Sequence, residues 1–309
     1  MATAYLTHAV GRDHEPGPSH PESPARLTAV NEALAGTTFD GLIRLEAPEA
    51  TGQQLEYIHD GAYVAAILAA VPEVGSRSLD SDTALSPASG EASLRAAGGV
   101  CAAIDAVAAG KVDNAFCAMR PPGHHAESIK AMGFCFFNNI AVGARHAQVV
   151  HGMERIAVVD FDVHHGNGTQ HSFENDATLF YASSHQWPAY PGTGAVSESG
   201  VGNIVNVPLD PHAGSIEFRA AYTDVILPAL RRFQPDLLLI SAGFDAHERD
   251  PLAQLKVQTE DFAWLTESLR DIAESLCGGR LVSTLEGGYD LQALAESAAA
   301  HVGVLLDSD

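Results

Sequence analysis

Short runs of apolar residues recur along the chain and predict the strands of a sheet. Aliphatic and β-branched side chains dominate each run, and turn-forming or charged residues bound it. Runs that are apolar throughout, rather than alternating, are typical of strands buried on both faces. They lie at Ala115–Met119, Ile156–Phe161, Thr178–Ala182, Ile204–Val207, Leu237–Ser241 and Leu281–Leu285.

Longer segments between these runs carry apolar residues at helical spacing. Because strands and helices alternate, we expect a three-layer α/β fold, with an open, mostly parallel sheet and helices on both of its faces. No repeat or linker-like tract interrupts the 309 residues, so we expect a single domain over residues 1–309. The expected helices are Arg26–Leu34, Ala62–Ala70, Glu91–Ala109, Asn139–Val150, Ser215–Phe233, Glu260–Leu276 and Leu291–Leu306.

Glycine, proline and polar residues gather directly after the predicted strands. In an open parallel sheet, ligands bind beyond the carboxyl ends of the strands. We therefore expect these loops to converge on one rim of the sheet and to carry the chemistry of the protein. The five loops are 120–125, 164–169, 191–194, 242–250 and 286–289.

The segment that follows the buried run Ile156–Val159 has the residue types of a catalytic metal site. Asp160, Asp162 and His164 alternate along it, and alternate residues of an extended segment share a face. Carboxylate oxygens and an imidazole suit a borderline metal such as zinc. Asp245, after the next strongly apolar strand, is the expected further ligand. Such a set leaves a coordination position open, as a catalytic metal requires.

Two further loops carry groups for proton transfer and for charge stabilisation. His124 and His125 are adjacent in a loop that Pro121 and Pro122 stiffen. Imidazole titrates near neutral pH, so it can take a proton from water and return it to a leaving amine. Tyr289 follows two glycines and could donate a hydrogen bond to a developing oxyanion.

Composition restricts the class of partner. The 39 acidic and 17 basic residues give a net charge of −22, which argues against binding to nucleic acid phosphates. This charge serves solubility and could also attract cationic substrates. The chain lacks a secretory N-terminal pattern and an apolar segment long enough to span a membrane. Its four cysteines show neither metal nor disulfide spacing, so we expect a soluble cytoplasmic protein.

Taken together, the loops resemble those of the histone deacetylase family, whose members have the arginase-deacetylase fold. The similarity keeps the family order over nearly the whole chain. Asn167 and the segment His185–Pro188 look closest to the class II branch and its bacterial relatives, which include deacetylases and acetylpolyamine amidohydrolases. The matching segments are 20–26, 120–126, 133–138, 160–170, 191–194, 241–251 and 286–289.

This resemblance implies a zinc-dependent hydrolase of N6-acetyl-lysine or a related acyl-lysine, carried by a protein, a peptide or a small amine. Asp162, His164 and Asp245 would ligate one zinc ion. His125 would be the general base and then the acid, while His124 would act electrostatically and bond to Asp160.

Other family positions imply the oxyanion group and the substrate tunnel. Tyr289 would polarise the acyl carbonyl beside the metal. The tunnel and its surroundings would involve Gly133, Phe134, Tyr190, Gly287, Leu252 and Arg26, with Arg26 near an internal cavity that accommodates acetate.

Family members also bind potassium, mostly through main-chain carbonyls. The resemblance implies a first structural potassium site at Asp160, Asp162, His164, Ser183 and Ser184. It implies a second site at the carbonyls of Phe173, Asp176, Leu179 and Asn203.

Two positions distinguish this chain from parts of the family. Many relatives place Asp behind the second histidine, where this chain has Asn167. A neutral amide orients His125 but stabilises its imidazolium less than a carboxylate would, so the pKa of His125 should be lower. Some class II relatives that are weak on acetyl-lysine carry His at the position of Tyr289, so Tyr289 predicts deacetylase activity.

Three alternatives remain open at this point. An acetylpolyamine amidohydrolase would share the fold and the chemistry, although Leu252 stands where such an enzyme can carry an acidic gate. An arginase-like enzyme would need a second aspartate two residues after Asp245, and that position is His247. A catalytically silent acyl-lysine-binding protein would retain the fold without the activity.

Overall fold

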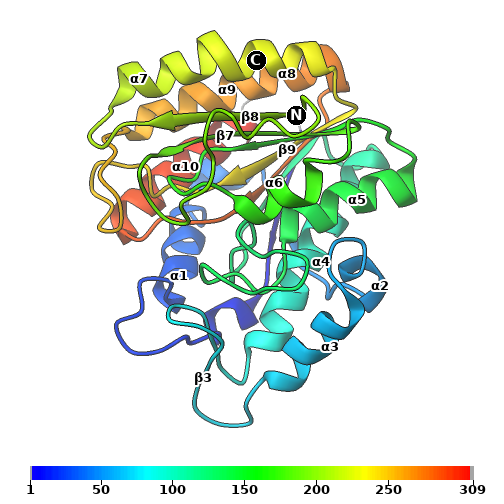
Figure 1. Cartoon of the computed structure of the whole chain (residues 1–309), viewed down its shortest axis with the longest axis vertical. Coiled ribbons are helices and arrows are strands. Elements are labelled where there is room, and N and C mark those ends of the chain that lie inside the picture. Colours follow the sequence, from blue (N-terminus) through cyan, green and yellow to red (C-terminus); the bar gives the residue numbers. More distant parts are fainter. Residues whose placement is uncertain (1, 307–309) are drawn as a thin grey trace.

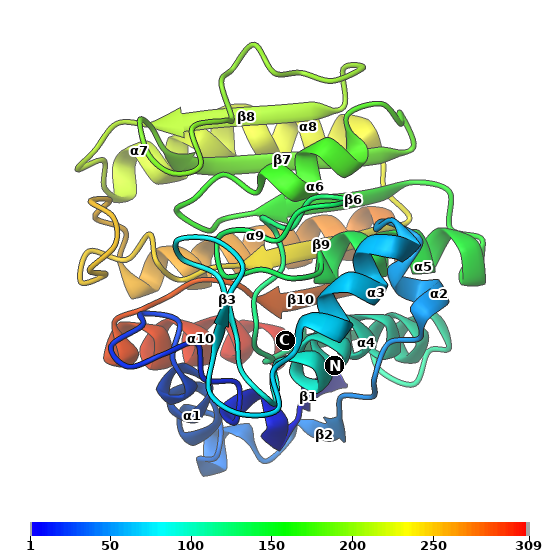
Figure 2. The ribbon, with the colours of Figure 1, turned by 60° about the horizontal axis from the view of Figure 1, so that its bottom comes forward.

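Eight parallel strands form the central sheet of the protein. The computed structural model describes residues 2–306; residue 1 and residues 307–309, at the two ends of the expected domain, lie outside the described residues. The sheet order is β2-β1-β5-β10-β9-β6-β7-β8, and each neighbouring pair is parallel (Figure 2). The strands are β1 Thr3–Thr7, β2 Ile43–Glu46, β5 Asn114–Cys117, β6 Ile156–Asp160, β7 Leu179–Gln186, β8 Ile204–Leu209, β9 Leu237–Ala242 and β10 Leu281–Leu285.

Helices cover both faces of this sheet (Figure 1). Along the central strands, side chains alternate between two apolar layers, as the pleat of a strand requires. Val159 and Ile240 pack with α1 and α7–α10, whereas Val158 and Leu239 pack with α4, α5 and α6. The helices are α1 Pro24–Ala33, α2 Gly52–Leu55, α3 Gly61–Ala70, α4 Ser89–Ala108, α5 Asn139–His151, α6 Asn167–Phe173, α7 Ser215–Ala220, α8 Leu227–Phe233, α9 Thr259–Cys277 and α10 Leu291–Leu306.

The fold class expected from the sequence is confirmed. All six predicted strands are present, and Leu281–Leu285 has the expected bounds. All seven predicted helices are also present, although a π-helical segment (Ala221–Ile226) divides Ser215–Phe233 into α7 and α8. Among residues 2–306, no helix is both long and apolar enough to cross a membrane.

The two strands at one edge of the sheet and the short helices α2 and α6 were not predicted from the sequence. All four residues of β2 are exposed, so its sequence Ile-Arg-Leu-Glu has no buried apolar run. Helix α6 begins at Asn167, within the loop interpreted as a metal site, and the flanking glycines Gly166 and Gly168 obscured its start. A short antiparallel pair, β3 Arg77–Ser78 and β4 Ala84–Leu85, was also not expected.

A buried ion-pair cluster joins the N-terminal part of the chain to the loops. The side chain of Glu22 is fully buried and accepts hydrogen bonds from Arg26 at 2.9 Å and from Arg120 Nη2 at 2.7 Å. Arg26 also donates to the carbonyl of Gly288. Burial alone would raise the pKa of Glu22, but the guanidinium groups, Arg120 foremost, lower it well below its usual range.

Replacing this carboxylate should destabilise the fold in a pH-dependent way. We expect Glu22→Gln to lower the free energy of unfolding by about 3–5 kcal/mol, because two guanidinium groups lose their buried partner. A lowered folded-state pKa gives stability that is complete above the unfolded pKa of about 4.3 and is lost as the pH falls through the folded value. The difference between wild type and variant in urea unfolding should therefore shrink as the pH falls below about 4.3.

The matched control is Glu73→Gln, because Glu73 is exposed. This variant should unfold at the wild-type urea midpoint. A Glu22→Gln variant as stable as wild type at neutral pH would contradict the role given to the cluster.

Candidate active site and metal centre

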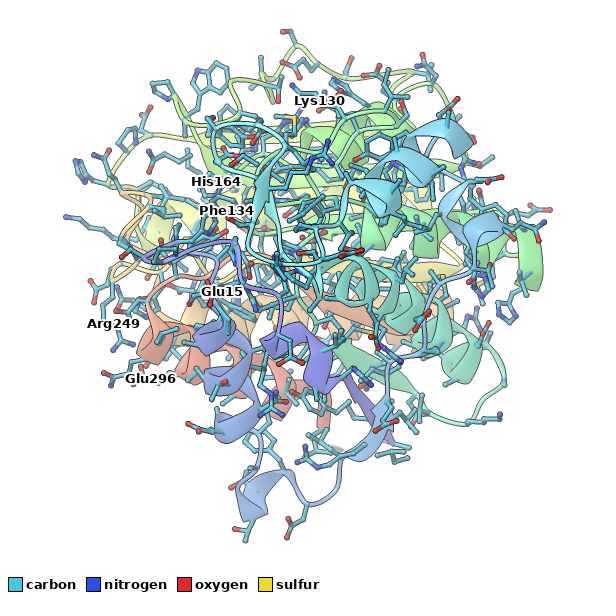
Figure 3. The ribbon with its side chains drawn as sticks, turned by 90° about the horizontal axis from the view of Figure 1, so that it is seen from below. Glu15, Lys130, Phe134, His164, Arg249 and Glu296 are labelled. Atoms are coloured by element: carbon cyan, nitrogen blue, oxygen red, sulfur yellow. The ribbon has the colours of Figure 1, made fainter. Side chains whose placement is uncertain are left out.

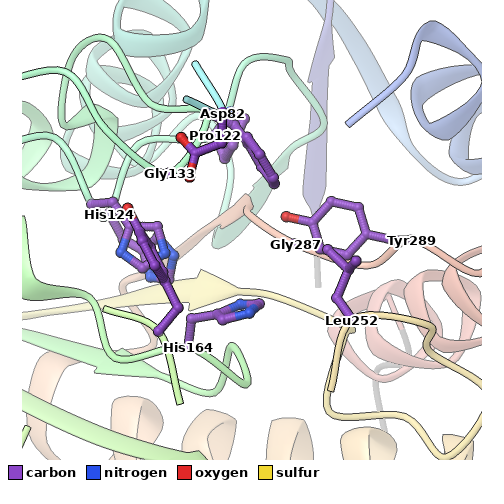
Figure 4. Close-up of a pocket in the computed structure, with 11 residues that line it drawn as sticks. Asp82, Pro122, His124, Gly133, His164, Leu252, Gly287 and Tyr289 are labelled. Atoms are coloured by element: carbon purple, nitrogen blue, oxygen red, sulfur yellow. The ribbon is translucent and has the colours of Figure 1, made fainter. Parts of the chain in front are cut away.

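A cavity of about 250 Å³ lies at the carboxyl ends of the four central strands. Because β5, β10, β9 and β6 are neighbours in the sheet, the loops that follow them meet at one rim. Figure 4 shows side chains from these loops facing the cavity. It is lined by Asp82, Pro122, His124, His125, Gly133, Phe134, His164, Tyr190, Leu252, Gly287 and Tyr289.

The three expected metal ligands are brought together beside this cavity, and of the three His164 lines it. His164 Nδ1 lies 3.1 Å from Asp162 Oδ1 and 3.2 Å from Asp245 Oδ2. Ligand atoms bound tetrahedrally to zinc at about 2.0–2.1 Å would lie about 3.3 Å apart, which is close to these separations. Asp162 and Asp245 are buried, so their negative charges lie together away from water.

The electrostatics of this set also suits a divalent cation. Burial, followed by the charge of Asp162, raises the pKa of Asp245 to about 7. A cation between the two carboxylates would favour the ionised form of both. The residues present therefore fit a zinc ion in their donor types, their spacing and their charge.

Because Gly243 and Gly287 have no side chain, the carboxylates of Asp162 and Asp245 can lie directly against the backbone at these two positions. A Cβ atom on Gly243 would lie 2.1 Å from Asp162 Oδ2, and one on Gly287 would lie 2.0 Å from Asp245 Oδ2. The amide of Gly287 donates to Asp162 Oδ2 at 2.8 Å. The Gly-Gly pair before Tyr289 thus lets the backbone approach the ligands, a role that the sequence analysis did not assign to Gly287.

His124 and His125 lie side by side but have different partners. His124 Nδ1 lies 2.9 Å from Asp160 Oδ2, and His125 Nδ1 lies 2.9 Å from Asn167 Oδ1. Both pairs are buried. The pairings expected from the resemblance are therefore present in the geometry.

These surroundings move the two imidazole pKa values in opposite directions. Burial alone would lower the pKa of His124, but Asp160, Asp162 and Glu286 outweigh it and raise the pKa well above its usual value. Burial, followed by the charges of His124 and His164, lowers the pKa of His125 well below its usual value. His124 is thus favoured as a cation and His125 as a neutral base.

A buried carboxylate that the sequence analysis did not single out holds the loop of the two histidines. Glu286 Oε2 accepts hydrogen bonds from the amides of Gly123 at 2.7 Å and of His124 at 3.2 Å. Its other oxygen accepts from Ser241 at 3.1 Å. The motif Glu-Gly-Gly-Tyr therefore positions the histidine loop as well as the tyrosine.

Tyr289 lines the cavity, and its hydroxyl points inward (Figure 4). Asp250 Oδ2 accepts a hydrogen bond from the Tyr289 amide at 2.7 Å, which fixes the backbone there. The guanidinium of Arg26 lies 4.9 Å from the centre of the Tyr289 ring. Arg26 does not line the cavity but lies behind Tyr289, so its expected place beside an acetate cavity remains a prediction.

Two aromatic residues expected in the tunnel, Phe134 and Tyr190, line the cavity, and their role as tunnel walls remains a prediction. The Phe134 ring lies 5.9 Å from that of Tyr289, and the Tyr190 ring lies 5.1 Å from that of His125. Phe134 and His164 lie close together in the view from below the molecule (Figure 3). Gly133 and Leu252 complete the expected walls.

The sequence analysis missed Asp82, which also lines the cavity. Asp82 lies between β3 and β4, far from the glycine-rich loops in sequence. The carbonyl of Asp82 lies 3.0 Å from His20 Nε2, and the neighbouring Thr83 hydroxyl accepts a hydrogen bond from the Phe134 amide at 3.1 Å. Only the surplus of acids in Asp80-Ser81-Asp82 could have drawn attention to this turn.

Three of the four carbonyls expected at the second potassium site converge, whereas that of Asn203 accepts a hydrogen bond from the Tyr181 amide. Those of Phe173, Asp176 and Leu179 lie 2.8, 3.0 and 2.7 Å from the side-chain nitrogen of Asn203. The Asn203 amide satisfies these carbonyls in this structure, so potassium at this place remains a prediction. At the first site, Asp160 and Ser183 are register partners in β6 and β7, and Ser184 follows directly.

Gly287 provides a test of the metal centre. We expect Gly287→Ala to weaken zinc binding at least about tenfold, because the new Cβ displaces the Asp245 carboxylate. A zinc titration against a competing chelator measures this. Gly303→Ala is the control, because nothing lies within 4 Å of a Cβ at that position. Unchanged zinc affinity of Gly287→Ala would contradict the assigned ligands.

Comparison with known proteins shows the family of the chain. The family model described as "Histone deacetylase domain" matches residues 20–305. The chain is 40% identical over 325 residues to "Histone deacetylase 14, chloroplastic" of Arabidopsis thaliana, covering 98% of this chain and 76% of that protein. It is 41% identical to the "Histone deacetylase-like amidohydrolase" of Pseudomonas aeruginosa, covering 87% of this chain and 72% of that protein.

A solved structure is similar over almost the full length. The HD domain of HDA15 superposes with a TM-score of 0.94 at 37% sequence identity, covering 99% of this chain and 88% of that one. The family model, the relatives and the fold agree with one another. The chain belongs to the histone deacetylase family.

Proposed function

We propose that this protein is a zinc-dependent lysine deacylase that hydrolyses the amide of N6-acetyl-lysine or of a related acyl-lysine. One observation carries the proposal. His164, His124, His125 and Tyr289 line one narrow cavity, and Asp162 and Asp245 lie against His164 within reach of the same metal ion. A bound zinc ion would polarise the acyl carbonyl and lower the pKa of a coordinated water toward ~7.

The residues of the chain would divide the remaining work. His125, neutral and buried, takes a proton from the attacking water and later returns it to the departing amine. His124 stays cationic against Asp160 and stabilises negative charge nearby. Tyr289 donates a hydrogen bond to the carbonyl oxygen as that oxygen gains charge. Phe134 and Tyr190 hold the apolar stem of the acyl-lysine and exclude water.

The second candidate, an acetylpolyamine amidohydrolase, gains support from Asp82. Asp82 lines the cavity together with Leu252, the residue that stands where such an enzyme can carry an acidic gate. A carboxylate at this place could attract the free ammonium of a polyamine. It could equally accept hydrogen bonds from the backbone amides that flank an acetyl-lysine in a peptide. We favour the peptide substrate because a single half-buried carboxylate, with the apolar Leu252 on the opposite side of the cavity, makes a weak cation gate (Figure 4).

Several further assignments complete the proposal. Residues 1–309 would act as one deacetylase domain, and potassium would occupy the carbonyl clusters. The protein would work in the cytoplasm, without direct contact to nucleic acid or membrane. The chloroplast location in the name of the Arabidopsis relative belongs to that protein. The acidic charge of −22 supports the exclusion of nucleic acid.

Tyr289→Phe tests the oxyanion role. We expect kcat to fall by roughly 10²–10³, because a donor to the developing oxyanion is lost. Zinc affinity should stay unchanged, since the phenol is not among the ligands. Steady-state kinetics on an acetyl-lysine peptide and a zinc titration provide the two measurements. Near-normal turnover would remove Tyr289 from the proposed mechanism.

A substrate panel separates the proposed deacylase from its alternatives. We expect kcat/KM for an acetyl-lysine peptide to exceed that for N-acetylputrescine by at least about tenfold. The reverse preference, abolished by Asp82→Asn, would favour the polyamine enzyme. Stoichiometric zinc without hydrolysis of either compound, or of longer acyl-lysines, would favour a silent binding protein.

A further inference from the structure

The Asn167 side chain links the proposed base, His125, to a carboxylate that none of the roles above uses. Asn167 Oδ1 lies 2.9 Å from His125 Nδ1. On its other side, Asn167 Nδ2 donates to Glu127 Oε1 at 2.7 Å. The same Glu127 oxygen lies 3.0 Å from Nδ1 of His171, whose side chain is 41% exposed. Asn167 is buried, whereas the Glu127 side chain is 29% exposed.

The chemistry of these groups determines the orientation of the amide. An ionised carboxylate only accepts hydrogen bonds, so Glu127 requires the NH₂ end of Asn167 to face it. The carbonyl end must then face His125, where it can accept a hydrogen bond only if Nδ1 carries the proton. Nε2 of His125 consequently keeps its lone pair, which is the form a general base needs. The weaker contact of Asn167 Nδ2 to the His125 carbonyl, at 3.3 Å, favours the same orientation.

Tight packing fixes the position of the His125 ring. The tautomer of His125 therefore depends on which end of the Asn167 amide faces Nδ1. A Cβ on Gly133 would lie 2.4 Å from the His125 ring. A Cβ on Gly168 would lie 2.1 Å from the Ala126 carbonyl. The start of α6 therefore lies directly against the backbone that carries His125. Within this packing, a reversed Asn167 amide would present NH₂ to Nδ1 and select the opposite tautomer.

Glu127 also explains the amide at position 167. An aspartate there would place two acceptor-only carboxylates about 2.7 Å apart in a largely buried site, which is unfavourable for both charges. The donor end of Asn167 makes this pair compatible. Glu127 and Asn167 thus form a matched acceptor and donor.

We infer that Glu127 is a positioning residue: it orients the Asn167 amide and thereby holds His125 in the tautomer whose Nε2 is free to accept a proton. The inference rests on the proposed function, in which His125 is the general base. Glu127 itself does not line the cavity and acts only through Asn167.

Glu127→Ala and Glu127→Gln separate this role from simple packing. Glu127→Ala removes the acceptor, so kcat on an acetyl-lysine peptide should fall by about 10–100-fold with KM nearly unchanged. Glu127→Gln keeps an oxygen that can accept from Asn167 and should retain kcat within about threefold. His171→Ala, which removes the other partner of Glu127, is the matched control and should also retain it. A Glu127→Ala variant within about threefold of wild type would overturn the inference.

Exchanging donor and acceptor gives a sharper test. Asn167→Asp alone should lose at least about tenfold in kcat, because the new carboxylate faces Glu127. Adding Glu127→Gln provides an amide NH₂ that can donate to the new carboxylate at position 167, so the double variant should recover most of the loss. Glu127→Gln should therefore change kcat little when Asn167 is present, and should raise kcat in the Asn167→Asp background. Purely additive effects would contradict the matched pair.

A spectroscopic readout distinguishes failure of this inference from failure of the proposed function. In zinc-loaded, substrate-free protein labelled with ¹⁵N-histidine, the ring nitrogen shifts of His125 report its tautomer. The signal is assigned by its absence in His125→Asn. Wild type should show a protonated Nδ1, and Glu127→Ala should show a mixture with protonated Nε2. An unchanged tautomer in Glu127→Ala would overturn the inference even if the protein hydrolyses acyl-lysine. A changed tautomer would support it even if the reaction proves different.

Discussion

Four carboxylates buried together at the centre of the molecule impose the constraint on which the site depends. Asp160, Asp162, Asp245 and Glu286 are each at most 1% exposed. Burial foremost, with help from neighbouring charges, raises the pKa of Asp245 and of Glu286 to about 7. An ionised carboxylate away from water costs several kcal/mol unless a cation or several donors compensate it. The positive charge of His124, the backbone donors and the proposed zinc ion supply this compensation.

The parallel sheet makes such a concentration of charge possible. Strands β6, β9 and β10 are neighbours and run in one direction, so the loops after them bring their acids to one rim. Close approach then requires positions without side chains. A Cβ on Gly166, like those on Gly243 and Gly287, would lie less than 2.5 Å from one of these carboxylate oxygens. The glycines are therefore consequences of the charge cluster rather than signs of loose loops.

The two adjacent histidines show how partners give identical side chains different tasks. Asp160 holds His124 as a cation, while the neutral Asn167 leaves His125 free of that stabilisation. The difference between the pKa values of the two histidines does not come from Asn167 alone. Burial and the charge of His124 also lower the pKa of His125. Asn167 in turn depends on Glu127, which requires a donor at that position. The proposed chemistry thus rests on acceptors and donors outside the cavity as much as on the residues that line it.

The sequence by itself determined the fold class, the strands of the sheet centre and the loops that carry the chemistry. Continuous apolar runs report burial on both faces, and Asp-x-His or Gly-Gly-Tyr motifs are local enough to be recognised along the chain. The family resemblance added the pairings of His124 and His125. Only the tertiary structure decided that Asp82 faces the cavity, that Glu286 accepts hydrogen bonds from the histidine loop and that Glu127 accepts one from Asn167. These roles depend on side chains from distant segments meeting in space, and no local pattern along a single sequence encodes which carboxylate will find which partner.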